Sequence, residues 1–282
     1  MQANSLSETA ARPNPTSGNQ PFYWEKHGQG KPVILIHGLA ASLRGWDYLI
    51  PELVAAGYAA YAIDLPGHGR SHQPQQPAEY HIEAIYAQMV NWIETLALQA
   101  PAVLVTHSLG GYLGLLYALR QPEQVECLVL TNPFFTPEQL IPPVRYFMHR
   151  PRLPIRMWAA APTWLVEIGV QLVEGYWRKL PEQMQQQIAS DFQRTSPKIL
   201  HIPSPVQDLT PRLAGIQQPA CVIWSRRDRT LRPRFYPRLV EQLPHSQQHV
   251  FPKCGHVLHL TNPQVYNQVV LDFLGTHPKK PA

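Results

Sequence analysis

Residues 103–112 read VLVTHSLGGY, and this stretch decides the fold. It joins a short run that predicts a strand, a turn that holds Ser108, and the start of an apolar helix. A serine between strand and helix is typical of a nucleophile elbow, in which a tight turn lifts the hydroxyl clear of a sheet. The helix that follows points its first N–H groups and its dipole at negative charge that develops nearby. The stretch therefore predicts an α/β fold with an exposed, reactive serine.

Short apolar runs alternate with amphipathic stretches on both sides of this motif. We expect strands at residues 33–36, 59–63, 102–106, 127–130, 220–224 and 249–251. We expect helices at residues 46–56, 82–98, 109–120, 236–243 and 263–274. Because most of the strands are continuously apolar, both faces of the sheet should be covered by helices. The alternation predicts an α/β fold with a mostly parallel, doubly wound sheet.

One segment, residues 135–208, interrupts this alternation. It shows no clear strand and contains frequent prolines, aromatic residues and helix-like patches such as 182–192. We expect residues 21–134 and 209–282 to form the core, with 135–208 as a helical cap inserted before the last two strands. Residues 1–20 lack the apolar segment of a secretory signal and are expected to form a flexible N-terminal tail.

Four motifs, taken in order, resemble those of the α/β-hydrolase superfamily. They are His37-Gly38-Leu39 after the first apolar strand, DLPGHGRS at 64–71 after the next, the turn around Ser108, and Gly255-His256 after the last strand. The resemblance covers nearly all of residues 22–274. Each motif alone is weak, because Ser-x-Gly occurs often by chance, but the four together in this order are specific.

The resemblance implies a catalytic triad and an oxyanion hole. Ser108 would be the nucleophile, His256 the base and Asp228 the acid, in the chain order of the family. A serine hydroxyl needs such a base, because it is a poor nucleophile at neutral pH. The backbone N–H groups of Leu39 and Leu109 would bind the oxyanion, each contributing about 2.7–4 kcal/mol in the transition state.

Other carboxyl groups compete for the role of the acid. Asp228 follows the predicted strand 220–224, where the family places an acid. Some members use the end of the preceding strand, but that place holds Asn132, which cannot serve. Asp191 and Asp208 precede strand 220–224 and are expected to be surface or helix-cap groups.

Residues near the predicted site also have ordinary structural interpretations. Thr106 stands where the family's elbow has a glycine, and it adds bulk beneath the turn. Ser108 could be an ordinary helix N-cap. His259 is expected to line a wall of the site, and His37 and His107 are expected to pack and hydrogen-bond near it without reacting.

The resemblance implies hydrolysis of a carboxylic ester, thioester or lactone of a fairly apolar small molecule, through an acyl-enzyme and without a cofactor. A serine at the elbow argues against the dehalogenases and epoxide hydrolases of the superfamily, which have aspartate there. Hydrolysis of a C–C bond, perhydrolase chemistry and ligand binding without turnover stay open. Tyr146, Trp158 and Trp164 either line a substrate pocket or simply form the core of the cap.

Arginine is concentrated in two clusters within a chain of formal net charge +5. The clusters are Arg145, Arg150, Arg152 and Arg156, and Arg226, Arg227, Arg229, Arg232, Arg234 and Arg238. One interpretation is a solvated face. The other is attraction to an anionic substrate or partner, or weak association with an anionic membrane surface. No nucleic-acid recognition motif accompanies the charge, so no nucleic-acid partner is expected. The oligomeric state stays open.

The composition bounds the remaining possibilities. Charged residues are 15% of the 282, below the usual value of about 25%, so a chain disordered by its charge is excluded. Two of the three cysteines, Cys127 and Cys221, lie in apolar runs, which favours a reduced, cytoplasmic setting over a disulfide framework. The chain has no Cys-x-x-Cys and no His-Glu-x-x-His, so no metal site is expected.

Overall fold

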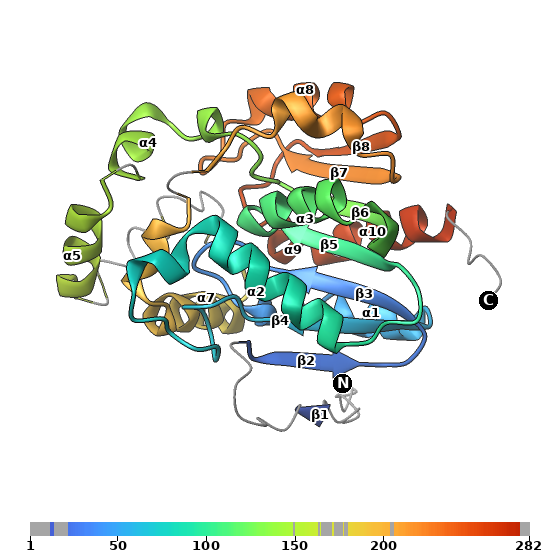
Figure 1. Cartoon of the computed structure of the whole chain (residues 1–282), viewed down its shortest axis with the longest axis horizontal. Helices are drawn as coiled ribbons and strands as arrows, with labels where there is room; N and C mark the ends of the chain where they lie inside the picture. Colours follow the sequence, from blue (N-terminus) through green and yellow to red (C-terminus); the bar gives the residue numbers. More distant parts are fainter. Residues whose placement is uncertain are drawn as a thin grey trace.

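An eight-stranded sheet runs through the molecule in the order β1-β2-β4-β3-β5-β6-β7-β8 (Figure 1). The computed structural model describes residues 12–13, 22–148, 150–162, 164, 171, 177, 180–203 and 206–276. β2 pairs antiparallel with both of its neighbours, and every pairing from β4 to β8 is parallel. This arrangement confirms the predicted, mostly parallel α/β sheet.

All six predicted strands are present, and two more join them at one edge. The strands are β1 (Arg12–Pro13), β2 (Trp24–His27), β3 (Lys31–Ile36), β4 (Tyr58–Ile63), β5 (Ala102–His107), β6 (Val125–Thr131), β7 (Ala220–Ser225) and β8 (Ser246–Phe251). β2 was not predicted, because its sequence WEKH contains no apolar run. β8 begins three residues before the predicted start, since this edge strand opens with polar, largely exposed residues.

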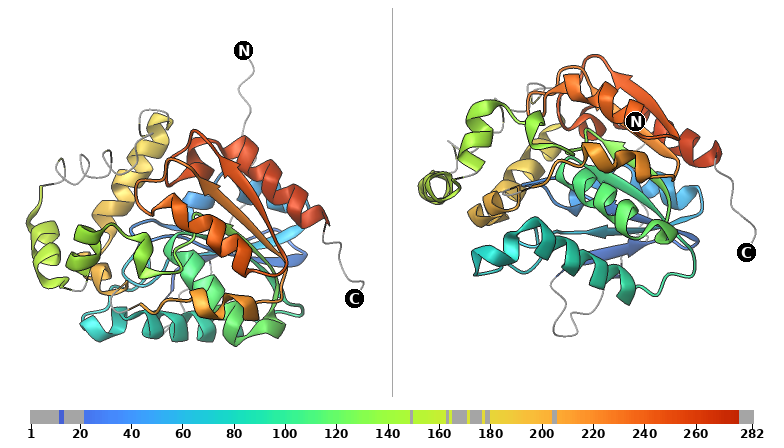
Figure 2. Two further views of the ribbon diagram at one scale, coloured as in Figure 1. Left: turned by 90° about the horizontal axis from the view of Figure 1, so that it is seen from above. Right: turned by 45° about the horizontal axis from the view of Figure 1, so that its top comes forward.

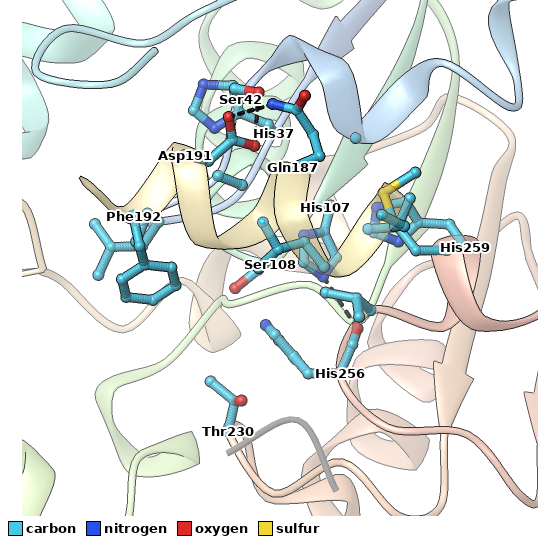
Figure 3. A pocket seen from close by; sticks show the side chains of 18 of the residues that line it. His37, Ser42, His107, Ser108, Gln187, Asp191, Phe192, Thr230, His256 and His259 are labelled. Carbon is cyan, nitrogen blue, oxygen red and sulfur yellow. Dashed lines mark hydrogen bonds between the residues drawn. The ribbon is translucent and has the colours of Figure 1, made fainter. Parts of the chain in front are cut away.

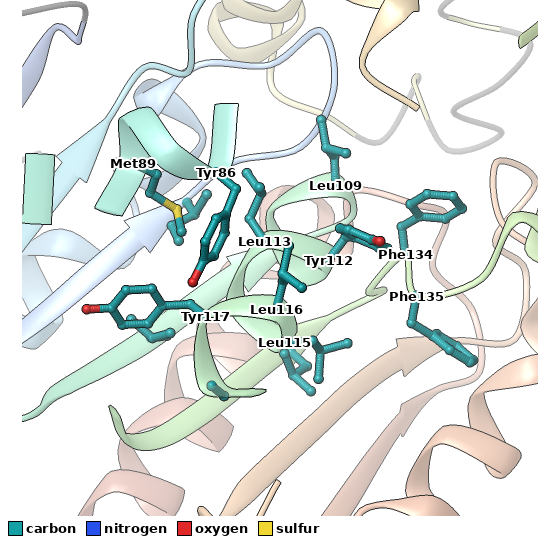
Figure 4. Close-up of a cluster of buried hydrophobic side chains, with 14 of the residues drawn as sticks. Tyr86, Met89, Leu109, Tyr112, Leu113, Leu115, Leu116, Tyr117, Phe134 and Phe135 are labelled. Carbon is teal, nitrogen blue, oxygen red and sulfur yellow. The ribbon is translucent and has the colours of Figure 1, made fainter. Parts of the chain in front are cut away.

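Apolar side chains of the central strands are divided between two cores, one on each face of the sheet. Ile34 and Ile36 of β3 belong to one core, whereas Val33 and Leu35 belong to the other. Successive side chains of a strand point to opposite faces, so a continuously apolar strand supplies both. Leu109–Ala118 of α3 are all buried in or beside the first core. Figure 4 shows buried side chains of this core, including those of α3.

Helices cover both faces of the sheet (Figure 2). The core next to α2 (Ile82–Thr95), α3 (Leu109–Arg120) and α8 (Tyr236–Gln242) lies on one face, and α1 (Ile50–Ala55), α9 (Leu258–Thr261) and α10 (Pro263–Thr276) pack on the other. The helix predicted at 46–56 is divided: a 3₁₀ turn, Leu43–Trp46, precedes α1. Pro51 lies in the first turn of α1, where its missing N–H is tolerated, and it helps to set this later start.

A helical insertion separates β6 from β7, as predicted. It contains α4 (Pro142–Met148), α5 (Arg152–Ala160) and α7 (Glu182–Arg194), and the described residues between 135 and 208 form no strand. Figures 1 and 2 both place α4 and α5 at the end of the molecule opposite the C-terminus, where the parallel strands have their carboxyl ends. Most of the predicted N-terminal tail lies outside the described residues, and Arg12–Pro13 of it form β1.

The three cysteines are buried, and no described helix could span a membrane. Cys127 and Cys221 are buried in β6 and β7, as predicted, and burial raises the pKa of both thiols to about 12. Cys254 is buried as well. Within the described parts of the chain, the helices are all too short or too polar to cross a membrane.

Candidate active site

Ser108 lies in a strained turn between β5 and α3. Its φ of 51° and ψ of −114° belong to a region that non-glycine residues rarely adopt. Backbone hydrogen bonds hold this conformation: the N–H of Ser108 donates to the carbonyl of Thr131 at 3.0 Å, and its own carbonyl accepts from Gly111 and Phe134, each at 2.9 Å. Ser108 is the N-cap residue of α3 by position, but its hydroxyl makes no capping bond to the helix. Ser108 lines a cavity instead (Figure 3).

Two glycines of α3 allow the helix to lie close to the sheet. A Cβ at Gly110 would lie 2.3 Å from the carbonyl oxygen of Ile36, so no larger residue fits there without a shift. A Cβ at Gly114 would lie 2.9 Å from Cγ2 of Thr106. The hydroxyl of Thr106 donates to the carbonyl of Val129 at 3.2 Å. Gly114 thus makes room for the threonine that replaces the usual elbow glycine.

Asp228 and His256 are joined by a short hydrogen bond. The distance from Nδ1 of His256 to Oδ2 of Asp228 is 2.7 Å, and both side chains are almost fully buried. Oδ1 of Asp228 accepts from the N–H groups of Thr230 at 2.8 Å and Leu231 at 2.9 Å. Tyr236 donates its hydroxyl to Oδ2 at 3.2 Å; burial and the nearby carboxylate raise the pKa of Tyr236 well above its ordinary value. These donors fix the carboxylate so that it can orient the imidazole.

Asn132 and His107 hold the loop that carries His256. The carbonyl oxygen of His256 accepts from Nδ2 of Asn132 at 2.7 Å and from Nε2 of His107 at 3.1 Å. Oδ1 of Asn132 accepts from the N–H of Ser225 at 2.9 Å, which links the ends of β6 and β7 to this loop. This role of Asn132 was not predicted from the sequence, which indicated only that Asn132 cannot serve as the acid. Its φ of 39°, a conformation that asparagine tolerates, suits the tight turn.

The structure brings the three predicted triad residues to one edge of the sheet. Ser108 follows β5, Asp228 follows β7 and His256 follows β8. Ser108 and His256 line the same cavity, and Figure 3 shows their side chains pointing toward one another. Asp228 lies behind His256, on the Nδ1 side of its ring. This is the arrangement that a nucleophile, a base and a group that orients the base would need for acyl transfer.

The loop after β3 lies against the elbow and provides the second predicted oxyanion donor. A Cβ at Gly38 would lie 3.0 Å from Cβ of Ser108, which shows how closely the loop approaches. Leu39 lines the cavity, and Leu109 is the first residue of α3. Within the described part of the chain, neither N–H donates to a protein acceptor. Both donors are thus available to an oxyanion.

Three further histidines line the cavity in a neutral state. His37 donates Nδ1–H to the carbonyl of Gly38 at 2.7 Å and accepts from the N–H of Leu65 at Nε2 at 2.9 Å. Burial lowers the pKa of His37 to about 3, and it lowers that of His107 well below the ordinary value. Burial lowers the pKa of His259 to about 3 as well, and its ring packs on Trp46. These contacts agree with the expected structural roles.

The cavity has a volume of about 410 Å³ and a largely apolar lining. Trp158 of α5 belongs to this lining and packs against Phe192 of α7, with ring centroids 5.6 Å apart. Tyr146 and Trp164 do not belong to it: they are 53% and 61% exposed. The sequence prediction is corrected for these two. Tyr146 lies on α4, and a short amphipathic cap helix turns only one face inward.

The predicted position of Asp191 is also wrong. It was expected at the surface or at a helix cap, but it is 5% exposed and lines the cavity. Oδ2 accepts from the hydroxyl of Ser42, and Oδ1 accepts from the side-chain amide of Gln187, each at 2.8 Å. Gln187 and Asp191 are four residues apart on α7 and share its inner face, a spacing visible in the sequence. Asp208 does cap a turn, since its Oδ1 accepts from the N–H of Thr210 at 2.9 Å.

The chain is similar to known proteins in sequence and in fold. Over 268 residues the chain is 28% identical to 2-hydroxy-6-oxo-6-phenylhexa-2,4-dienoate hydrolase of Burkholderia cepacia, covering 88% of each chain. Its fold matches a thermophilic esterase from Thermogutta terrifontis with a TM-score of 0.81 and 21% identity, over 95% of this chain and 98% of the other. It also matches the enol-lactonase from Burkholderia xenovorans LB400, with a TM-score of 0.75 and 21% identity, over 90% and 96%.

A family model also matches most of the chain. The model of the alpha/beta hydrolase family matches residues 33–269, which include the elbow, the insertion and the last strand. Among the described residues, no group of three or more His, Cys, Asp or Glu side chains could hold a metal ion. The match spans most of the chain, and the protein belongs to the α/β hydrolase family.

Proposed function

We propose that this hydrolase cleaves a carboxylic ester, thioester or lactone through Ser108, His256 and Asp228. The observation that carries the proposal is the 2.7 Å hydrogen bond from Nδ1 of His256 to Asp228, with Ser108 facing the same imidazole in the cavity. Because Nδ1 donates its proton to Asp228, the other ring nitrogen, Nε2, is the one that can accept the serine proton.

The reaction proceeds through a covalent acyl-enzyme. Oγ of Ser108 attacks the carbonyl carbon while its proton passes to Nε2 of His256, which becomes an imidazolium beside Asp228. The N–H groups of Leu39 and Leu109 stabilise the oxyanion of the tetrahedral intermediate. His256 then returns the proton to the leaving alcohol or thiol. Water then attacks the carbonyl carbon of the acyl-enzyme while His256 takes a proton from it. His256 returns this proton to Oγ of Ser108 as the carboxylic acid leaves.

The lining of the cavity favours a fairly apolar substrate. Trp158, Ile188 and Phe192 supply apolar surface from α5 and α7, and Leu39 supplies it from the loop after β3. Burial of apolar surface contributes about 25 cal/mol per Å² to binding, before the costs of association. The cavity volume of about 410 Å³ lies in the range of small-molecule sites and leaves room for an acyl group of medium length.

A second candidate is hydrolysis of a C–C bond beside a ketone. It is favoured by two relatives: the phenylhexadienoate hydrolase of Burkholderia cepacia, 28% identical to this chain, and the 2-hydroxy-6-oxononadienedioate/2-hydroxy-6-oxononatrienedioate hydrolase of Comamonas testosteroni, 27% identical. The same serine, histidine and aspartate can serve both reactions, so the triad does not separate them. Perhydrolase activity and ligand binding without turnover are the remaining alternatives.

The test is turnover of p-nitrophenyl esters of graded chain length by the wild type and by Ser108→Ala. The wild type should hydrolyse the medium-length esters, and the substitution should lower kcat by about 10⁴-fold or more. Ser246→Ala on the edge strand β8 is the matched control and should keep full activity. Equal rates for wild type and Ser108→Ala would overturn the proposal. Cleavage of the dienoates without any ester hydrolysis would favour the second candidate.

A further inference from the structure

We propose that Asp191, with Ser42 and Gln187, forms a polar subsite that binds a hydrogen-bond donor on the substrate, an ammonium group in preference to a hydroxyl. The proposal rests on the proposed function, because the subsite and the reacting serine share one cavity. Figure 3 shows Ser42, Gln187 and Asp191 grouped on one side of Ser108, with His256 and Thr230 on the other. A substrate could therefore be held at one end while it reacts at the other.

The carboxylate of Asp191 is held in place but keeps hydrogen-bonding capacity. Ser42 and Gln187 each donate to one of its oxygens at 2.8 Å. Each carboxylate oxygen can accept about two hydrogen bonds, so one position on each remains for a ligand. Both partners are neutral, so they orient the carboxylate without cancelling its charge. Ser42 is also buried, at 3% exposure, which makes this a preformed site and not a mobile surface group.

The charge balance of the cavity favours a cation over an anion. None of the described lining residues is Arg or Lys. Beyond the lining, Arg194 of α7 attracts the carboxylate of Asp191 and Asp64 repels it. A buried carboxylate without an adjacent cation is costly, and a bound ammonium would offset that cost. A dienoate, the anion named for the relative from Burkholderia cepacia, would be repelled.

The experiment compares p-nitrophenyl alkanoates with analogues that end in a hydroxyl, an ammonium or a carboxylate, over a series of chain lengths. At the length that reaches the subsite, the wild type should prefer ammonium to methyl in kcat/KM and should disfavour carboxylate. Asp191→Asn should lower the ratio of ammonium to methyl roughly tenfold. Asp208→Asn, which lies outside the cavity lining, is the matched control and should keep the wild-type ratio.

A second measurement on the wild type does not depend on the folding of a variant. Burial raises the pKa of Asp191 to about 6, so the ratio of ammonium to methyl should fall as the pH drops through that value. Any change at His256 that alters kcat/KM for both substrates by the same factor cancels in the ratio. His37, with a pKa of about 3, stays neutral, whereas Asp64, whose pKa burial raises to about 6, protonates in the same range.

The outcomes separate the subsite from the proposed function. A ratio that is the same in wild type and Asp191→Asn, or one that does not change with pH, would overturn the subsite while ester hydrolysis stands. A preference for the terminal carboxylate would also overturn it. If the wild type hydrolyses none of the esters, the proposed function fails, and the subsite fails with it.

A different observation carries a second proposal, on the outer surface of α4 and α5. Six of the eight exposed large hydrophobic side chains in the described residues lie between 141 and 164: Ile141, Val144, Tyr146, Leu153, Met157 and Trp164. The same segment carries Arg145, Arg150, Arg152 and Arg156 and contains no Asp or Glu. We infer that this surface, the outer cap surface, binds an anionic membrane.

The helix α5 has the pattern of an interfacial helix. Leu153 and Met157 are four residues apart and exposed, and Arg152 and Arg156 run beside them at the same spacing. Trp158, on another face of the helix, lines the cavity. A basic amphipathic helix lies in the headgroup region, where its apolar side chains enter the acyl boundary and its arginines meet anionic lipid. The absence of acids along the segment favours this occupant over a second copy of the chain, whose net charge is +5.

The test is cosedimentation with phosphatidylcholine vesicles that contain or lack phosphatidylserine. Binding should require phosphatidylserine and should weaken at high salt, because the attraction is screened. Leu153→Ser with Met157→Ser, and Arg152→Glu with Arg156→Glu, should each abolish most of the binding. Arg238→Glu on α8, exposed but outside the outer cap surface, is the matched control. The proposal would be overturned if the protein binds neither kind of vesicle or binds both equally. It would also be overturned if the Leu153 and Met157 variant loses a dimer and keeps its binding to vesicles.

Discussion

At the scale of single residues, the account depends on how Asp228 orients His256. Asp228→Asn should keep the fold and lower kcat by about 10⁴-fold, because an amide can donate to Nδ1 and thereby place the imidazole proton on the nitrogen that faces the serine. Kinetics with a short p-nitrophenyl ester, together with circular dichroism, measure both effects. Near-normal turnover would mean that another group serves as the acid.

Asn132 is a positioning residue whose role can be separated from general stability. Asn132→Ala removes the donor to the carbonyl of His256 and the acceptor of the Ser225 N–H, and should cost about 1–3 kcal/mol of stability. It should also lower kcat, because the His256 loop loses a fixed point. Thr131→Val, which removes the neighbouring hydrogen bond to Tyr266, is the control: it should lower stability and leave kcat unchanged. Equal kcat for the two variants would contradict the positioning role.

The location of a single residue could be predicted where the local sequence fixes it, and could not be predicted where packing decides it. Ser108 and His256 stand in short motifs whose turns place them, so their location could be predicted. Asp191 could not, because only the docking of α7 decides which side of that helix faces the cavity. The same reason explains why Trp158 lines the cavity and Tyr146 does not.

At the scale of elements, the close contact between β5 and α3 can be tested by a double-mutant cycle. Gly114→Ala should cost about 1–3 kcal/mol, because its Cβ would lie 2.9 Å from Cγ2 of Thr106. Thr106→Ser removes that methyl group and keeps the hydroxyl that bonds Val129. In the Thr106→Ser background, Gly114→Ala should therefore cost nothing or stabilise the helix. The free energy of unfolding in urea measures this, and an equal cost in both backgrounds would refute the contact.

Elements buried on both faces were predicted well, and edge elements were not. β3, β5 and β7 are continuous apolar runs, since both faces of each strand pack against helices. β2 and the start of β8 lie toward the edges of the sheet and are partly polar, so their periodicity is weak. The helical insertion was recognised by the interruption of the strand pattern, while its inner and outer faces were not assigned.

At the scale of the whole molecule, buried histidines should make the fold sensitive to acid. Burial lowers the pKa of His37 and His259 to about 3 and of His68 to about 4, and it lowers that of His107 well below its ordinary value. As the pH falls below about 6.5, the unfolded chain binds protons that these four groups cannot bind when folded. Their contribution to stability is therefore lost in acid.

Two buried carboxyls act in the opposite direction but do not cancel this effect. The pKa of Asp64 and that of Asp191 are raised to about 6, so both are protonated in the folded state at pH 5 and ionised in the unfolded state. With four histidines and two carboxyls, the unfolded chain binds about two more protons than the folded chain near pH 5. The free energy of unfolding should therefore fall by about 3 kcal/mol for each pH unit that the pH drops in this range. Urea unfolding near pH 7.5 and near pH 5 measures this. Equal or higher stability at the lower pH would contradict it.

The central claim, that Ser108 is the nucleophile activated by His256, is tested most directly with a fluorophosphonate probe and peptide mapping by mass spectrometry. The account predicts one adduct, on Ser108 in the peptide that joins β5 to α3, and its loss in Ser108→Ala. Labelling should also be strongly slowed in His256→Ala, since the base is then missing. Labelling of a different residue, or ester hydrolysis without any adduct on Ser108, would contradict the claim.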